Sequence, residues 1–221
     1  MNECNAILAG VMEYEEAWQL QKDILRLRTD KLVNDTLILL EHPHVITIGR
    51  NGNMNNILAN KDVLENKGIK TYTIERGGDV TYHGYGQIVG YTILSLDKFS
   101  RDIHTFVAKI EELFITLLKN EYNINSTVDK KYPGIWVNNK KITAIGFSVK
   151  KWITYHGFAF NVNTDMEYFK LINPCGIMDR GVTSLQEILG EKVEIPMLQT
   201  KIIEYFKNVF EYENIVYKDI V

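Results

Sequence analysis

Residues 135–149 have the sequence IWVNNKKITAIGFSV, and this stretch decides the fold class. Two apolar runs are separated by Asn138, Asn139 and Lys140, which is the spacing of two strands joined by a hairpin turn. A further apolar run at 155–162 predicts another strand. This part of the chain is therefore expected to form a sheet.

Apolar residues recur at helical spacing in three other regions. The first runs from Tyr14 to about Leu32, with glutamates in its first turn that favour the positive end of a helix. The second follows Ser100, which we expect to cap it, and continues to Leu117 as one apolar stripe. The third follows Pro196, a residue that a first helical turn tolerates. These helices are expected to pack on the sheet.

Short runs rich in β-branched residues predict further strands at 36–40, 45–48, 70–74 and 89–96. The chain contains no internal repeat, low-complexity tract or linker, and its strands and helices do not alternate regularly. We therefore expect an α+β fold with a mixed β-sheet packed by helices, forming a single domain over residues 1–221.

Composition and charge argue against a nucleic-acid-binding, membrane-spanning or secreted protein. The chain has 221 residues, 45% of them apolar, with a formal net charge of −3 and a pI near 6.0. This charge gives no field that would gather nucleic acid, and no apolar run is long enough to span a bilayer. The first residues lack the pattern of a secretory signal, and two cysteines are too few for a disulfide framework. We expect a soluble cytoplasmic protein.

The segment RGGDVTYHGYGQ, residues 76–87, places four glycines between two predicted strands. Glycine allows the backbone to approach a ligand closely, although a tight turn with a bulge would have the same composition. The segment lacks the ending of a P-loop, and Val89 stands where a dinucleotide-binding motif requires its third glycine. These residues alone leave a ligand-contacting loop and a plain turn both open, and they contain no nucleotide-binding motif. Among the histidines, His83 is the best candidate for a role in a site.

Cys175 lies in the segment NPCG, residues 173–176, where proline and glycine predict an exposed loop. Exposure is what a nucleophilic thiol needs, whereas an isolated cysteine can equally be a small buried hydrophobe. Cys4 is expected in a frayed terminus with no catalytic role.

Other polar residues leave alternatives open. His42 and His44 would project to one face of a strand and could bind zinc, but Pro43 and the lack of further ligands at suitable spacing disfavour a metal site. His104 is expected to be solvated, and His156 to pack or hydrogen-bond rather than ionise. The lysine pairs at 140–141 and 150–151 are typical of solvated hairpin ends. A lysine beside a thiol can also activate it, and the spacing does not choose among the four.

Five motifs occur together and in order: EHP at 41–43; RGG at 76–78 with TYHG at 81–84; KI at 141–142; HGFA at 156–159 with NV at 161–162; and NPCG at 173–176 leading to GVTSL at 181–185. With these motifs the chain resembles the lipoyl(octanoyl) transferases, from about Tyr14 to Leu189. The resemblance implies the single α/β catalytic domain that this family shares with biotin and lipoate ligases. It agrees with the mixed sheet expected from the residues.

The resemblance also implies the site. Cys175 would carry an acyl thioester, and Lys141 would activate it. The segments that match the substrate-binding walls comprise Arg76, Gly77, Gly78, Asp79, Val80, Thr81, Tyr82 and His83, then Ala144, Ile145 and Gly146, and then Gly157, Phe158 and Ala159.

By the same resemblance, the expected activity moves an octanoyl group from octanoyl-acyl-carrier-protein to a lysine of an apo lipoyl domain. The acceptors would be the lipoyl domains of 2-oxoacid dehydrogenases and the glycine cleavage H protein. The family uses no ATP, cofactor or metal, so we expect none here. Membranes and nucleic acids are not expected partners.

Two residues depart from the family pattern. Tyr85 replaces a usual proline, which puts the loop shape and chain-length selectivity in question, and Thr143 stands where a smaller residue is common. The alternatives are an ATP-dependent lipoate ligase, which shares the RGG motif but lacks NPCG in this form, and a non-catalytic acyl- or metal-binding protein. A biotin ligase is disfavoured because its Gly-Arg-Gly-Arg type of loop is absent.

Overall fold

The computed structural model describes residues 2–174 and 180–220. Its elements in chain order are β1 (Glu3–Val11), α1 (Tyr14–Thr29), β2 (Asp35–Glu41), β3 (Val45–Ile48), η1 (Met54–Asn56), α2 (Lys61–Asn66), β4 (Lys70–Thr73), β5 (Val80–His83), β6 (Gln87–Ile93), η2 (Leu96–Phe99), α3 (Ile103–Tyr122), β7 (Thr127–Val128), β8 (Gly134–Val137), β9 (Lys140–Lys150), β10 (Ile153–Asn161), η3 (Met166–Leu171), β11 (Gly181–Val182), α4 (Leu185–Leu189), α5 (Ile195–Val209) and β12 (Asn214–Tyr217). The η elements are short 3₁₀-helices.

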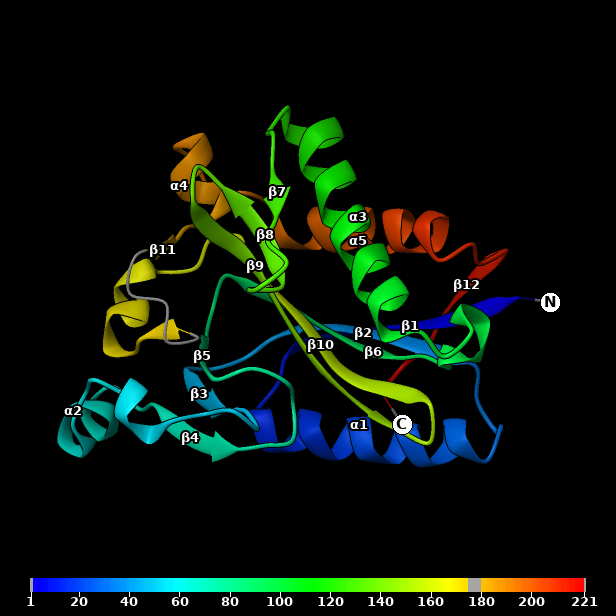
Figure 1. The fold of residues 1–221 in the computed structure, drawn as a ribbon, viewed down its shortest axis with the longest axis horizontal. Coiled ribbons are helices and arrows are strands. Elements are labelled where there is room, and N and C mark those ends of the chain that lie inside the picture. Colours follow the sequence, from blue (N-terminus) through cyan, green and yellow to red (C-terminus); the bar gives the residue numbers. More distant parts are fainter. Residues whose placement is uncertain (1, 175–179, 221) are drawn as a thin grey trace.

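A large mixed sheet forms the centre of the molecule (Figure 1). Across the described residues its order is β12-β1-β2-β6-β10-β9-β8-β7, and β11 pairs with one end of β9. The pairs β12–β1, β1–β2 and β11–β9 are parallel, and the others are antiparallel. The expected mixed sheet packed by helices is confirmed.

Helices cover both faces of this sheet (Figure 1). Alternate residues of the strands turn to opposite faces. In β2, Leu37 and Leu39 pack with α3 and α5, whereas Ile38 and Leu40 pack with α1. All four side chains are buried, which explains why this strand reads as a continuous apolar run rather than an alternating one.

A smaller sheet, β4-β3-β5, lies beside the large one at the left of Figure 1. Its apolar face packs with residues of η3, and Tyr82 is part of that cluster. This sheet brings the glycine-rich segment that precedes β5 over β9, because the N–H of Gly77 donates to the carbonyl oxygen of Phe147 at 3.0 Å. The two sheets thereby form the walls of a cleft.

Two local predictions were wrong. Asp102, not Ser100, caps α3, since its side chain accepts a hydrogen bond from the N–H of His104, while Ser100 adopts a left-handed backbone conformation. The segment around Cys4 is not frayed, because Cys4 is fully buried in β1. The long α1, α3 and α5 helices are confirmed, and Pro196 lies in the first turn of α5 as predicted. No helix in residues 2–174 and 180–220 combines the length and apolarity that a membrane crossing requires.

Candidate active site

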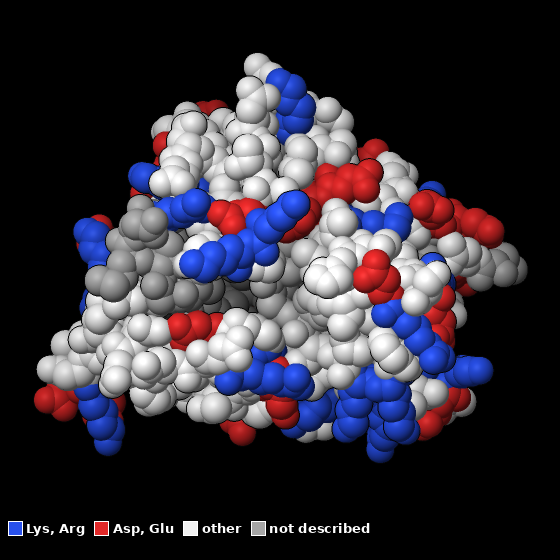
Figure 2. Space-filling model, viewed as in Figure 1, with Lys and Arg blue, Asp and Glu red and all other residues white. Residues whose placement is uncertain are grey.

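Two adjoining cavities open beside the β9–β10 hairpin. The larger is a cleft of about 1320 Å³, and the smaller has a volume of about 290 Å³. Thr81, Lys141, Ala144 and Ala159 line both of them. Figure 2 shows a hollow near the middle of one face, with lysine and arginine side chains on both sides of it. Concave sites of this size are where ligands usually bind.

The glycine-rich segment 76–79 forms one wall of the larger cleft. Its backbone lies so close to β9 that a Cβ added at Gly146 would stand 2.9 Å from the carbonyl oxygen of Gly77. Gly78 has a φ of +90°, a conformation that side-chain-bearing residues rarely adopt. Glycine is therefore required here by the approach of two backbones and by a strained turn.

Arg76 and Asp79 border the larger cleft and hydrogen-bond to residues between Thr47 and Asn56. The Arg76 guanidinium donates to the carbonyl oxygens of Thr47 and Asp79, each at 2.7 Å. The Asp79 carboxylate accepts from the N–H of Asn53 at 2.9 Å and from the side-chain amide of Asn56. Both residues therefore shape this wall through contacts within the protein.

Strand alternation divides the residues of β5 into two sets. Thr81 and His83 line the larger cleft. Val80 and Tyr82 are buried in the apolar cluster of the smaller sheet, against residues such as Phe169. The family resemblance implied all four residues as substrate-binding. The structure brings the side chains of Thr81 and His83 to the cleft, whereas those of Val80 and Tyr82 point into the apolar cluster.

His83 is held as a neutral, hydrogen-bonded imidazole. Its Nδ1 lies 2.7 Å from Oε1 of Gln87, and its Nε2 lies 3.4 Å from the hydroxyl of Thr47. Burial, followed by the charge of nearby His42, lowers the pKa of His83 to about 3. The side chain is therefore suited to fixing a wall of the cleft rather than to exchanging protons near neutral pH.

His42 and His44 do not form a joint site. His42 Nε2 lies 2.7 Å from the hydroxyl of Tyr91, and His44 Nδ1 lies 2.7 Å from that of Tyr82. Burial lowers the pKa of His42 to about 4. Among residues 2–174 and 180–220, no three His, Cys, Asp or Glu side chains gather as a metal site would require. His104 is exposed at the start of α3, as expected for a solvated side chain.

The other two predicted wall segments pair with each other in the sheet. The cross-strand pairs are Ala144 with Ala159, Ile145 with Phe158, and Gly146 with Gly157. All six residues line the larger cleft. A Cβ added at Gly157 would stand 2.3 Å from the carbonyl oxygen of Gly90, so this position also requires glycine.

Lys141 differs from the other three lysines of its two pairs. Its side chain is buried, with 8% of its surface exposed, whereas Lys140, Lys150 and Lys151 are exposed. Nζ of Lys141 donates to the carbonyl oxygen of Pro133 at 3.2 Å. Of these four lysines, only Lys141 lines both cavities.

Trp136 forms the surface against which Lys141 lies, and its sequence context carries no sign of a functional role. Nζ of Lys141 is 4.8 Å from the centre of the indole, and the Arg180 guanidinium is 5.0 Å from it. Arg180 in turn forms an ion pair with Asp129 at 2.5 Å. The indole therefore stabilises two cations through their attraction to its π face.

Cys175 lies outside the described residues. The residues on either side of the undescribed segment are close to the cavities, because Pro174 and Arg180 both line the smaller one, together with Lys141. The N–H of Asn173 donates to the carbonyl oxygen of Asn56 at 2.7 Å.

Three buried polar residues near the cavities were not predicted as site residues. Gln87 and Asn161 line the smaller cavity. Gln87 is the last residue of the glycine-rich segment 76–87, and Asn161 is the first residue of the NV motif. These positions were the only sequence features that could have marked the two residues as part of a site. His156 lines the larger cleft, and burial, then the charge of Arg76, lowers its pKa to about 3, in line with the prediction that it does not ionise.

Comparison with known proteins identifies the family. The family described as lipoyl protein ligase A/B catalytic domain matches residues 13–207. An octanoyltransferase of Caldicellulosiruptor saccharolyticus is 53% identical over 207 residues, which cover 93% of this chain and 88% of the relative. An octanoyltransferase of Desulforamulus reducens is 48% identical, covering 92% and 90% respectively. The chain belongs to the octanoyltransferase family.

Solved structures support the fold of this family. The structure of lipoate-protein ligase A bound with ATP matches with a TM-score of 0.79 at 18% identity, covering 99% of this chain and 90% of that one. The biotin protein ligase of Aquifex aeolicus matches with a TM-score of 0.54 at 14% identity, covering 96% and 70%. The octanoyltransferase fold seen here is thus the one expected from the sequence, and at such identities the likeness shows the fold alone.

Proposed function

We propose that this octanoyltransferase moves an octanoyl group in two steps, from octanoyl-acyl-carrier-protein to the thiol of Cys175 and then to a lysine of an apo lipoyl domain. The observation that carries the proposal is the position of Lys141. It is a buried lysine at the junction of two cavities, and the described ends of the segment that contains Cys175 line one of them. Nucleophile and proton acceptor are expected side by side in such an enzyme.

In the first step the Cys175 thiolate attacks the thioester carbonyl of the donor while Lys141 is an ammonium. The carrier thiol leaves with a proton from Lys141, which becomes a neutral amine. One thioester replaces another, so the free energy changes little and no ATP is needed. The charge of Lys141 favours the thiolate before attack.

In the second step the amine of the acceptor lysine attacks the acyl-cysteine. Neutral Lys141 takes the proton that this amine loses, and the Cys175 thiolate leaves. The resting ammonium and thiolate are thereby restored. An amide is more stable than a thioester, so this step drives the cycle.

The octanoyl chain would occupy the larger cleft, between segment 76–79 and the β9–β10 pair. The glycines at 77, 146 and 157 support this assignment because they leave backbone, rather than side chains, along the wall. Burial of each CH₂ contributes about 0.8 kcal/mol, which favours octanoyl over very short acyl groups.

The proposed acceptors are the apo lipoyl domains of 2-oxoacid dehydrogenases and the glycine cleavage H protein. One solved structure with the same fold is titled as a bipartite lipoate protein ligase and its E2 lipoyl domain from Thermoplasma acidophilum. That ligase and its lipoyl domain support the proposal that this fold presents its site to a folded lipoyl domain.

Intact-mass spectrometry tests the proposal directly. After incubation with octanoyl-acyl-carrier-protein we expect one octanoyl adduct, which peptide mapping places on Cys175 and which disappears when an apo lipoyl domain is added. Product formed only with free octanoate and ATP would instead indicate a ligase. If neither condition gave an adduct or a product, the result would support a non-catalytic acyl-binding protein instead.

A further inference from the structure

A chain of buried hydrogen bonds runs from β5 of the smaller sheet, through β6 and β10 of the large sheet, to the end of β11. Nδ1 of His83 lies 2.7 Å from Oε1 of Gln87, Nε2 of Gln87 donates to Oδ1 of Asn161 at 2.8 Å, and Nδ2 of Asn161 donates to the carbonyl oxygen of Thr183 at 3.0 Å. The four side chains are between 1% and 7% exposed. Hydrogen bonds so buried are costly to leave unmade, so the network holds its members in one arrangement.

The direction of each bond in this chain is fixed. Gln87 also donates to the carbonyl oxygen of Tyr82 at 3.2 Å, so its amide nitrogen points away from His83 and its oxygen accepts the imidazole N–H. Asn161 then has to accept from Gln87 with its oxygen and donate to Thr183 with its nitrogen. A carboxylate at position 161 could keep the first of these bonds but not the second.

Thr183, where the chain of bonds ends, is joined to Lys141. Its N–H donates to the carbonyl oxygen of Lys141 at 3.0 Å, and the preceding residue, Val182, is the strand partner of Lys141. β11 has only two residues, so its own pairing with β9 contributes few hydrogen bonds. The side chain of Asn161 supplies an additional bond at this point.

We propose that Asn161 is a positioning residue, whose amide holds β11 against β9 and so fixes Lys141 relative to the wall of the cleft that contains His83. This inference rests on the proposed function for its effect on catalysis. Thr183 follows Cys175 by eight positions in the sequence, so the same bond also fixes where the chain that carries the proposed nucleophile joins the sheet.

Asn163 provides a matched control two residues away. Its Nδ2 donates to the carbonyl oxygen of Val193 at 2.8 Å, and its Oδ1 accepts from the N–H of Val193 at 2.9 Å. An aspartate at either position therefore loses a donor to a carbonyl oxygen and keeps an acceptor. Asn163 lines neither cavity.

The experiment compares Asn161→Asp with Asn163→Asp in octanoyl transfer per folded molecule. We expect kcat to fall about 10²-fold in Asn161→Asp, because small displacements of reacting groups cost that much, while KM stays within about threefold of wild type. We expect Asn163→Asp to stay within about twofold in both constants. Equal kcat values for the two variants would overturn the proposal.

Amide hydrogen exchange tests the hydrogen bond without reference to activity. We expect the Thr183 amide to exchange faster in Asn161→Asp and to be unchanged in Asn163→Asp, since the Thr183–Lys141 bond opens more often when β11 is released. Unchanged Thr183 exchange in Asn161→Asp would overturn the proposal.

If the wild-type protein itself transferred no octanoyl group, the proposed function would fail while the exchange result still decided the positioning role. Should Asn161→Asp not fold, the neutral Asn161→Ser, which is too short to reach Thr183, takes its place with the same expectations.

Discussion

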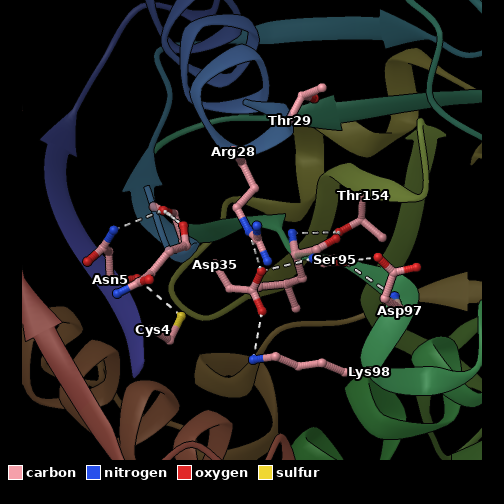
Figure 3. Close-up of polar contacts among 12 residues, drawn as sticks. Cys4, Asn5, Arg28, Thr29, Asp35, Ser95, Asp97, Lys98 and Thr154 are labelled. Carbon is pink, nitrogen blue, oxygen red and sulfur yellow. Dashed lines mark hydrogen bonds and ion pairs between the residues drawn. The ribbon is translucent and has the colours of Figure 1, made fainter. Parts of the chain in front are cut away.

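Asp35 and Lys141 are both buried charged residues, in opposite settings. The Asp35 carboxylate, only 2% exposed, is surrounded by internal partners, most of which appear in Figure 3. Arg28 lies 2.7 Å and Lys98 3.0 Å from its oxygens, the N–H of Ser95 donates at 2.9 Å, and the hydroxyl of Tyr212 donates at 2.8 Å. Burial alone would raise the pKa of Asp35, but the Ser95 N–H, Lys98 and Arg28 together hold it below its ordinary value.

Lys141 instead lies where the fold is open. Its ammonium contacts a backbone carbonyl oxygen and the face of Trp136, and the residue lines both cavities. Asp35 lines neither cavity. A buried charge that is enclosed by its partners contributes to stability, whereas one that faces a cavity can exchange protons with a ligand. Substitutions at the two places should therefore separate folding from activity.

The two cysteines extend this contrast. Cys4 is fully buried near Asp35, and its thiol donates to the carbonyl oxygen of Asn5 at 3.3 Å (Figure 3). Burial, followed by the charge of Asp35, raises the pKa of the Cys4 thiol, so it stays protonated and unreactive.

The largest expected effect is that of Cys175→Ala. The variant should form no octanoyl adduct and lose transfer by about 10³-fold or more, because a methyl group cannot attack a thioester. Intact-mass spectrometry and a transfer assay measure this. Cys4→Ala is the control and should keep both adduct and rate, although it leaves a small cavity in the core. Transfer by Cys175→Ala at the wild-type rate would rule out the covalent mechanism.

Lys141→Arg should come next, with a loss of about 10²- to 10⁴-fold in kcat, the usual contribution of a general acid–base. Arginine keeps the positive charge but cannot release a proton near neutral pH. Lys140→Arg, at the neighbouring exposed position, is the control and should be near wild type. If both variants were equally active, Lys141 would act only through its charge.

Gly146→Val should have a smaller and selective effect. The new side chain would start 2.9 Å from the carbonyl oxygen of Gly77, so it would push on the opposite wall and fill the cleft. We expect the octanoyl transfer rate to fall about tenfold more than the acetyl rate, because the longer chain needs more of the cleft. A competition between the two acyl donors measures the ratio of the octanoyl and acetyl transfer rates. An equal fall in both rates would show that Gly146 does not line the acyl pocket.

The sequence predicted the elements whose signal is local and missed those that depend on distant pairing. The apolar stripe of α3 identifies that helix from its own residues. β1 gives no such signal, because its parallel partners are β2 and the last strand, β12. The cap of α3 was placed two residues early, since Ser100 and Asp102 are both good caps and only the backbone conformation distinguishes them.

The predicted site follows the same division. Short spacing placed residues 144–146 and 157–159 in strands, but their pairing with each other in the wall of the cleft is seen only in the fold. Four lysines looked equivalent by their spacing, and the family resemblance alone singled out Lys141. In the structure Lys141 also differs from the other three by its burial against Trp136. Val80 and Tyr82 were included because a motif is continuous, whereas a strand turns alternate side chains away. The roles of Cys175 and Lys141 stay predictions.

Asp35→Asn should have the smallest effect on activity and a clear effect on stability. Removing the negative charge leaves Arg28 and Lys98 without their partner. Because these two side chains are 18% and 35% exposed, the loss in the free energy of unfolding should be smaller than the about 3–5 kcal/mol typical of a fully buried pair. The pKa of Asp35 is lower in the folded protein than in the unfolded chain, so its contribution is present above the unfolded pKa of about 3.9 and is lost as the pH falls through the folded pKa. Urea unfolding should therefore show a large wild-type advantage at pH 7 that shrinks below about pH 4, while transfer per folded molecule at pH 7 changes less than about twofold. Two outcomes would contradict this inference: Asp35→Asn could unfold like wild type at pH 7, or it could lose transfer without losing stability. Either would show that Asp35 does not serve folding alone, in contrast to Lys141.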